Sequence, residues 1–109
     1  NIVLVFQPHR FSRTQILFKD FVRELSLWKK LYLVDIYSAF EETKKELSSN
    51  ILYKEVKKIN NSVKYFSSKE KLIEKIISES KKRATIVITM GAGDIRDVGF
   101  DIRNKISKS

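Results

Sequence analysis

Hydrophobic residues along the chain form two kinds of pattern that alternate. Short continuous apolar runs, rich in β-branched and aromatic side chains, have the length of buried strands. These runs are residues 2–6, 31–36, 63–66 and 85–90. After each run, apolar residues recur every three or four positions, which predicts an amphipathic helix. The predicted helices span about residues 13–27, 51–59, 68–83 and 95–106. A strand followed by a helix, four times over, predicts an α/β fold: a mainly parallel sheet of about four strands with helices on both faces.

Polar residues at the ends of these segments indicate where the helices start and stop. Residues 12–15 and 67–70 have the Ser-x-x-Gln and Ser-x-x-Glu spacing of a capping box. Residues 48–50 are good cap residues for the second helix. Gly99 should weaken the middle of the last helix, and the polar tail from Ser107 should fray.

Length and composition exclude several classes of protein. The 109 residues contain no linker or repeat, so we expect a single domain over 1–109. The first residues already belong to a strand, so we expect a domain cut from a longer protein, or the tail of one. There are no cysteines, which excludes disulfides and thiolate metal sites. No apolar run approaches the roughly 20 residues that span a bilayer, and the run at 2–6 is too short for a signal peptide. We expect no membrane partner and a cytoplasmic location.

The net charge of +9, from 22 basic and 13 acidic residues, has two interpretations. One is a partner rich in phosphates or carboxylates. The other is a lysine-rich solvated surface. The lysines of 54–58 and 69–82 are interleaved with glutamates, and this pattern favours the second interpretation.

Candidate chemistry gathers where the strands end, the edge at which open α/β sheets bind ligands. Arg10 and Arg13 follow the first strand, at the mouth of a helix whose free N–H groups already favour anions. Two guanidiniums there would suit a carboxylate or phosphate. They could equally pair with Asp35 or Asp94 and fix the loop. The pattern leaves both open.

His9, the single histidine, stands beside these arginines. It could be a general base, a metal ligand or a structural group. Without a second histidine or a cysteine a metal site is poor, and no catalytic triad can be assembled. A structural or substrate-orienting role is therefore favoured, and we predict neither a catalytic nor a metal-binding residue.

The turn after the last strand, Gly91, Ala92, Gly93 and Asp94, allows a close backbone approach to a ligand. It is not a dinucleotide fingerprint, because Arg96 stands where the third glycine belongs. The alternative is a tight turn, with Asp94 as the cap of the next helix. Three aromatic residues near the same edge could form a wall of the site or belong to the core: Phe11, Tyr37 and Phe40.

Three motifs together resemble the C-terminal domain of the Mur ligases, enzymes of bacterial peptidoglycan synthesis. They read Val-Phe-Gln-Pro-His-Arg-Phe-Ser-Arg-Thr at 5–14, Asp-Ile-Tyr-Ser-Ala at 35–39 and Thr-Met-Gly-Ala-Gly-Asp-Ile at 89–95. The resemblance spans essentially the whole chain. It implies a Rossmann-like three-layer sandwich that lacks the opening strand and helix of that domain. Ser38 and Phe40 depart from the proline and glycine usual in the second motif.

The resemblance also implies a function. The family member most like this chain joins L-alanine to UDP-N-acetylmuramate, using ATP and Mg²⁺ to form an acyl-phosphate that the amino group attacks. Arg10 and Arg13 would hold the alanine carboxylate with His9 beside them, and residues 91–94 would line the same cleft. ATP and Mg²⁺ would be bound mainly by N-terminal and central domains missing here, so the fragment alone should be inactive. The alternatives are a free-standing basic module that binds nucleic acid or another polyanion, and a regulatory domain.

Overall fold

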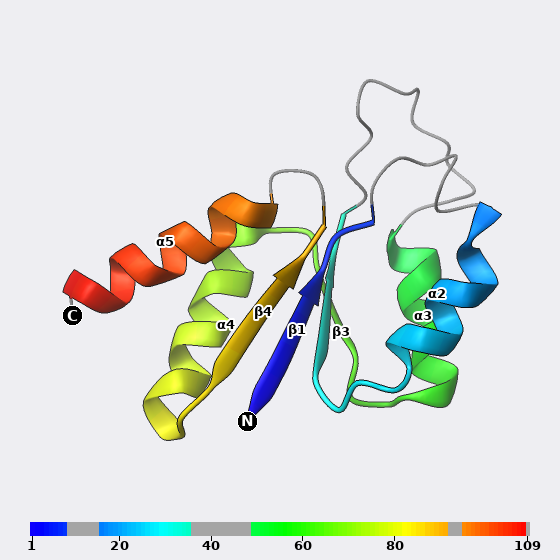
Figure 1. The fold of residues 1–109 in the computed structure, drawn as a ribbon, viewed down its shortest axis with the longest axis horizontal. Helices are drawn as coiled ribbons and strands as arrows, with labels where there is room; N and C mark the ends of the chain where they lie inside the picture. The colour runs from blue at the N-terminus through cyan, green and yellow to red at the C-terminus, as the bar shows by residue number, and fades with distance from the viewer. Residues whose placement is uncertain (9–15, 36–48, 92–94, 109) are drawn as a thin grey trace.

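The sheet has four strands, and every pairing between them is parallel (Figure 1). The structure, a computed structural model, describes residues 1–8, 16–35, 49–91 and 95–108. The strands are β1 (Ile2–Phe6), β2 (Leu31–Val34), β3 (Lys64–Phe66) and β4 (Ile86–Met90). Their order in the sheet is β3-β2-β1-β4, so β1 and β2 are central and β3 and β4 form the edges. The predicted parallel sheet is confirmed.

Helices cover both faces of this sheet. They are α2 (Phe18–Leu25), α3 (Ser49–Ile59), α4 (Lys69–Lys82) and α5 (Ile95–Lys108). Figure 1 shows α2 and α3 on one side and α4 and α5 on the other, which confirms the three-layer α/β arrangement. Among the helices described, none has the length and apolar character needed to cross a bilayer.

The continuous apolar run of β1 is explained by burial on both faces. Val3 and Val5 belong to the core beneath α4 and α5, while Leu4 and Phe6 belong to the core beneath α2 and α3. All four are less than a tenth exposed. Since successive side chains of a strand point to opposite faces, only a strand covered on both sides can be apolar throughout.

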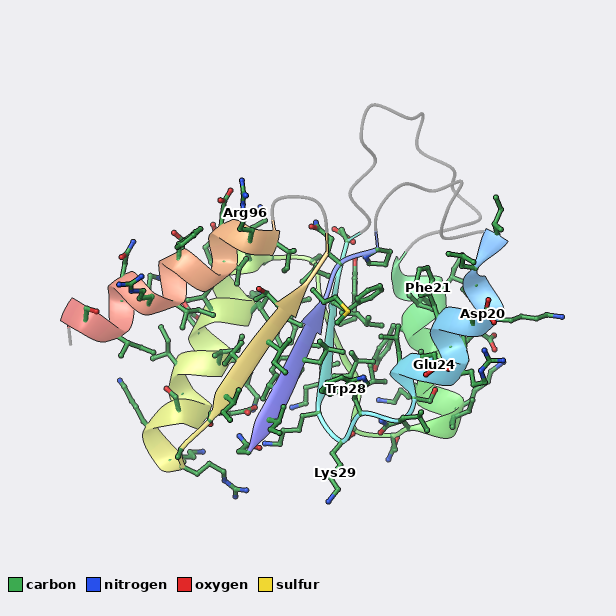
Figure 2. All side chains as sticks on the ribbon, viewed as in Figure 1. Asp20, Phe21, Glu24, Trp28, Lys29 and Arg96 are labelled. Carbon is green, nitrogen blue, oxygen red and sulfur yellow. The ribbon has the colours of Figure 1, made fainter. Side chains whose placement is uncertain are left out.

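Helix α2 shows the amphipathic pattern predicted for it but is shorter than predicted. Phe21 lies on its sheet side and packs against the core, whereas Asp20 points outward (Figure 2). Residues 13–15 of the predicted helix, and the capping box at 12–15, lie outside the described residues. At the other end the helix stops at Leu25 rather than about residue 27. The backbone N–H of Trp28 bonds to the carbonyl of Leu25 at 3.2 Å, a tight three-residue turn that leads into β2.

Further boundaries differ from the prediction by one or two residues. The prediction of a capping box at 67–70 was wrong, because Ser68 rather than Ser67 is the N-cap of α4. The Ser68 hydroxyl accepts a hydrogen bond from the Lys71 N–H at 3.3 Å. β3 begins at Lys64 because the N–H of Val63 bonds back to Asn60 in a turn. β4 begins at Ile86 rather than at residue 85, and β2 ends at Val34 rather than at residue 36. The tail predicted to fray from Ser107 is helical to residue 108.

Candidate functional site

The predicted site lies largely beyond the residues that the structure describes. Gly91 is described. The other predicted site residues lie outside the described ranges: His9, Arg10, Arg13, Ala92, Gly93 and Asp94. The aromatic residues 11, 37 and 40 lie outside them as well. The described residues that flank these segments are Pro8 after β1, Asp35 after β2 and Gly91 after β4. Since β2, β1 and β4 are neighbours in a parallel sheet, these three residues stand at its carboxyl edge.

Gln7 ties this edge together. Its side chain is 6% exposed, and its amide Nε2 donates to the carbonyl of Asp35 at 3.2 Å. Its Oε1 accepts a hydrogen bond from the N–H of Ile95, the first residue of α5, at 3.1 Å. Its backbone N–H donates to the carbonyl of Met90 at 3.0 Å. One side chain therefore links the ends of β1 and β2 to the start of α5.

Gln7 is not among the site residues predicted from the sequence, although it begins the segment 7–13 expected at this edge. The available signal was its position, as a polar residue between a buried apolar run and a proline. A polar side chain at the end of a buried strand must find hydrogen-bond partners. The sequence does not reveal those partners, because they lie 28 and 88 residues away.

Gly91 is fixed by close backbone packing. Its φ is +154°, a conformation that residues with a side chain rarely adopt. A Cβ built there would lie 2.8 Å from the carbonyl oxygen of Gln7 and 3.0 Å from Cγ2 of Ile95. At this position the structure therefore supports the tight-turn interpretation: Gly91 lets the chain turn directly against Gln7.

Asp35 has a partner that the sequence did not suggest. Its carboxylate accepts a hydrogen bond from the hydroxyl of Tyr65 on β3. Burial raises the pKa of Tyr65 to about 12, with the hydrogen bond to Asp35 and the charge of that carboxylate adding to the effect. Tyr65 is therefore a neutral donor at physiological pH, and it holds the Asp35 carboxylate at the carboxyl edge.

Arg96 is a cation near the same edge. In the sequence it stood out only because it replaces the third glycine of a dinucleotide-binding motif. It is exposed on the first turn of α5 and points beyond the end of the sheet (Figure 2). A cation in the first turn opposes the helix dipole, so the dipole does not favour Arg96 there. Within the described ranges, no three acidic or histidine side chains gather into a group that could hold a metal ion.

No model of a protein family matches the chain. UDP-N-acetylmuramate–L-alanine ligase of Lachnoclostridium phytofermentans is 39% identical over 105 residues, which is 96% of this chain and 22% of that protein. The enzyme of the same name from Caldicellulosiruptor saccharolyticus is 38% identical over 87% of this chain and 21% of its own length. The one from Agathobacter rectalis is 38% identical over 96% of this chain and 23% of its own length.

The chain spans about a fifth of the length of these relatives, yet the similarity covers nearly all of the chain. The matched part is the C-terminal part of the relatives. The parallel sheet with helices on both faces agrees with the Rossmann-like fold implied by the motifs. The chain therefore belongs to the Mur ligase family, of which it represents the C-terminal domain.

Proposed function

We propose that this chain is the amino-acid-binding domain of an ATP-dependent ligase that joins L-alanine to UDP-N-acetylmuramate in peptidoglycan synthesis. The observation that carries the proposal is the similarity to several ligases of that name over 87–96% of the chain. In this proposal the domain closes over the active site, and the remaining domains bind the UDP-sugar, ATP and Mg²⁺. The ligase works in the cytoplasm.

Arg10 and Arg13 hold the carboxylate of L-alanine in this proposal, with His9 beside them. Two planar guanidiniums give the forked, charge-assisted hydrogen bonds that suit a carboxylate. The described residues support this role, because the segment that carries the arginines follows a residue that is held by hydrogen bonds. The side chain of Gln7, two residues before His9, hydrogen-bonds to the backbone of Asp35 and of Ile95. In this proposal, a fixed Gln7 limits the positions that the two guanidinium groups can reach.

The chemical contribution of this domain is positioning. A carboxylate held by two arginines orients the alanine amino group toward the activated carboxyl of the sugar, which lowers the entropic cost of the reaction. ATP supplies the phosphoryl group that activates that carboxyl. In this proposal the other domains of the ligase bind both ATP and the accompanying Mg²⁺. The isolated chain should therefore be inactive.

Steady-state kinetics of the full-length ligase test this assignment. Arg10→Ala and Arg13→Ala should each raise the KM for L-alanine by about 10- to 100-fold, the cost of a lost charge-assisted hydrogen bond, with the KM for ATP little changed. Arg23→Ala is the matched control, because Arg23 is exposed on α2 and pairs with Asp20 at 3.0 Å. An unchanged KM for alanine in both site variants would remove the carboxylate assignment.

The positive charge does not favour the alternative of a nucleic-acid-binding module. Several lysines on α3 and α4 pair with glutamates of their own helix, as Lys58 does with Glu55 at 2.9 Å and Lys75 with Glu79 at 3.5 Å. Others, such as Lys54, are exposed on helix surfaces. This is the interleaved pattern of a solvated helix face.

We also propose that a strand and a helix upstream of β1 complete this domain at the β4 edge. β4 pairs with β1 alone among the described strands, and three apolar side chains near this edge remain open: Ile2, 49% exposed; Ile86, 61% exposed; and Met90, 47% exposed. Ile86 and Met90 lie on the α2 side of the sheet, since Ile88 packs in that core.

The handedness of the chain supports this location. The crossover from β1 to β2 runs toward β3 and places α2 on one face. A strand outside β4 would cross to β1 in the same direction, so the right-handed rule puts its helix on the same face, over Ile86. Because the chain has no cysteines, Ile86→Cys can be labelled selectively in it, and in a full-length ligase whose other cysteines are replaced. Maleimide should react readily in this chain and slowly in the full-length ligase, whereas equal rates would refute the completed edge.

A further inference from the structure

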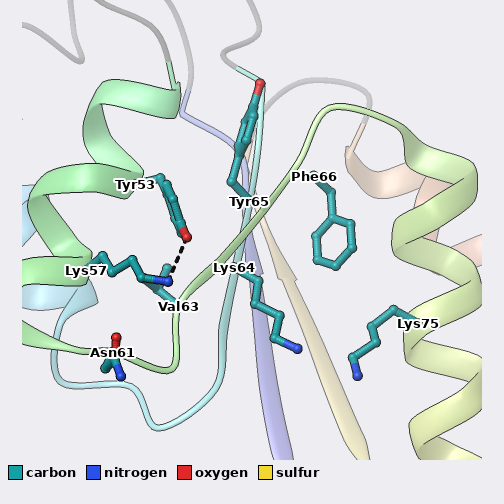
Figure 3. A pocket seen from close by; sticks show the side chains of 8 residues that line it. All are labelled: Tyr53, Lys57, Asn61, Val63, Lys64, Tyr65, Phe66 and Lys75. Carbon is teal, nitrogen blue, oxygen red and sulfur yellow. Dashed lines mark hydrogen bonds between the residues drawn. The ribbon is translucent and has the colours of Figure 1, made fainter.

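The β3 edge of the sheet carries a groove that shares Tyr65 with the carboxyl edge described above. It follows β3 between α3 and α4, and its volume is about 540 Å³ (Figure 3). Tyr53 and Lys57 of α3 form one wall, and Lys75 of α4 forms the other. The rest of the lining comes from β3 and the turn before it: Asn61, Val63, Lys64, Tyr65 and Phe66.

The floor of the groove is an open strand edge. β3 pairs with β2 on one side, and no other strand of the described ranges lies on its outer side. Backbone groups of alternate residues in a paired strand point away from the neighbour, so the outer side of β3 presents hydrogen-bonding groups to the groove. An extended peptide can pair with such an edge through its own backbone.

The charged side chains that line the groove are all lysines: Lys57, Lys64 and Lys75. Lys75 also pairs with Glu79 of its own helix at 3.5 Å, so Lys57 and Lys64 carry most of the positive charge that a ligand would meet. Figure 3 shows Lys64 and Lys75 on one side of β3 and Lys57 on the other. Lys64 is exposed and has no ion pair within the described part of the chain. Cations on both sides of the strand would face carboxylates at successive positions of an added strand, whose side chains alternate between the two faces.

The aromatic side chains of the groove are already engaged, which argues against the stacking of nucleic-acid bases. The ammonium of Lys57 lies 5.3 Å from the ring centroid of Tyr53 and donates to its hydroxyl at 2.9 Å. Phe66 packs edge-on against Tyr32, with ring centroids 5.3 Å apart. Base binding would need free ring faces. Backbone pairing needs none.

We propose that the outer edge of β3 binds an extended acidic peptide segment, which adds a strand to the sheet between α3 and α4. The outward-facing backbone groups of residues 64–66 provide the pairing, and the lysines that line the groove, Lys57 and Lys64 above all, select for carboxylates. A lysine on an edge strand can instead have the sole role of preventing edge-to-edge pairing with another chain, and hence aggregation. The experiment must therefore separate specific strand pairing from simple charge attraction.

Fluorescence anisotropy can test the proposal with a labelled peptide that carries glutamates at successive positions, flanked by valines, so that carboxylates lie on both faces of the added strand. The control peptide has the same charge but a central proline, which removes a backbone donor and disfavours pairing. The 109-residue chain should bind the first peptide at least about tenfold more tightly than the second. Lys64→Glu should weaken binding by about tenfold, while Lys19→Glu, the same charge change at an exposed position on α2, should have a much smaller effect.

Amide hydrogen exchange gives a second readout that charge attraction alone would not change. The bound peptide should slow exchange at the outward-facing amides of residues 64–66 and leave α2 unaffected. Equal binding of the two peptides, or equal loss in the two lysine variants, would overturn the proposal. So would tighter binding of single-stranded oligothymidine than of the acidic peptide.

Discussion

The side-chain oxygen of Gln7 accepts a hydrogen bond from the backbone N–H of Ile95 at 3.1 Å, across 88 residues of sequence. The first N–H groups of a helix have no partner within the helix, so Gln7 acts as a cap for α5 supplied by another strand. The same side chain holds the carbonyl of Asp35. The segments that carry the predicted arginines and the glycine turn therefore adjoin one hydrogen-bonded junction.

Replacing Gln7 by alanine should destabilise the fold. The variant leaves the Ile95 N–H and the Asp35 carbonyl without their partner in a buried place, which costs about 1–3 kcal/mol of unfolding free energy. Urea denaturation followed by circular dichroism measures this loss. Lys19→Ala, at an exposed position, is the control and should change stability by less than about 0.5 kcal/mol. Equal stability of the two variants would show that the junction does not hold the edge.

Gly91→Ala should be costly at the same junction. The new methyl group would lie 2.8 Å from the Gln7 carbonyl oxygen, at a φ of +154° that alanine rarely adopts. Strain and overpacking together should lower the unfolding free energy by at least about 2 kcal/mol. The midpoint of urea denaturation reports the change, and a midpoint equal to the wild-type value would contradict the packing described.

Gly99→Ala should have the opposite effect and is the matched control for Gly91. Gly99 lies inside α5, and a Cβ there would meet the Thr89 side chain at 3.9 Å, an ordinary contact. Alanine should therefore stabilise the helix by about 0.5–1 kcal/mol. The same denaturation series measures it. A loss of stability would mean that the face of α5 over β4 has less room than the structure shows.

The layers of this fold could be predicted because they depend on local patterns. The apolar run of β1 and the three- and four-residue spacing on α2 each report burial from nearby sequence alone. The ends of elements were less predictable, since neighbouring groups compete for the same bonds. Ser67 and Ser68 are both suitable caps, and only the path out of β3 decides that Ser68 accepts the Lys71 N–H.

The described contacts at the edge could not be predicted, because they join distant residues. Tyr65 reaches Asp35 over 30 positions, and Gln7 reaches Ile95 over 88. No periodicity encodes such pairs. The roles given to His9, Arg10 and Arg13 come from the family motif and stay predictions, since these residues lie outside the described part of the chain.

Acid should weaken the fold partly through Glu79, whose side chain is 13% exposed on α4. Burial acts to raise the pKa of Glu79, but hydrogen bonds from Tyr32 and Lys30, with the charges of Lys30 and Lys75, leave the pKa below its ordinary value of 4.5. A carboxyl whose pKa is lowered by folding stabilises the fold above its unfolded pKa. That contribution is lost as the pH falls through the lowered value.

Glu79→Gln removes this titration and should flatten the fall of unfolding free energy on acidification. Glu74→Gln, at an exposed position on the same helix, is the control and should leave the acid slope as in the wild type. Urea midpoints measured from neutral pH to below 4.5, the ordinary carboxyl value, provide the comparison. Identical acid slopes in the two variants would contradict the role of Glu79.

The carboxylate-binding role of Arg10 is tested most directly by changing the enzyme and the substrate together. The full-length ligase and its Arg10→Ala variant are each assayed with L-alanine and with L-alaninamide, which lacks the carboxylate. If Arg10 holds that group, the preference of the wild-type enzyme for alanine, as a ratio of kcat/KM values, should fall by about tenfold or more in the variant. A preference that is the same in both enzymes would contradict the account.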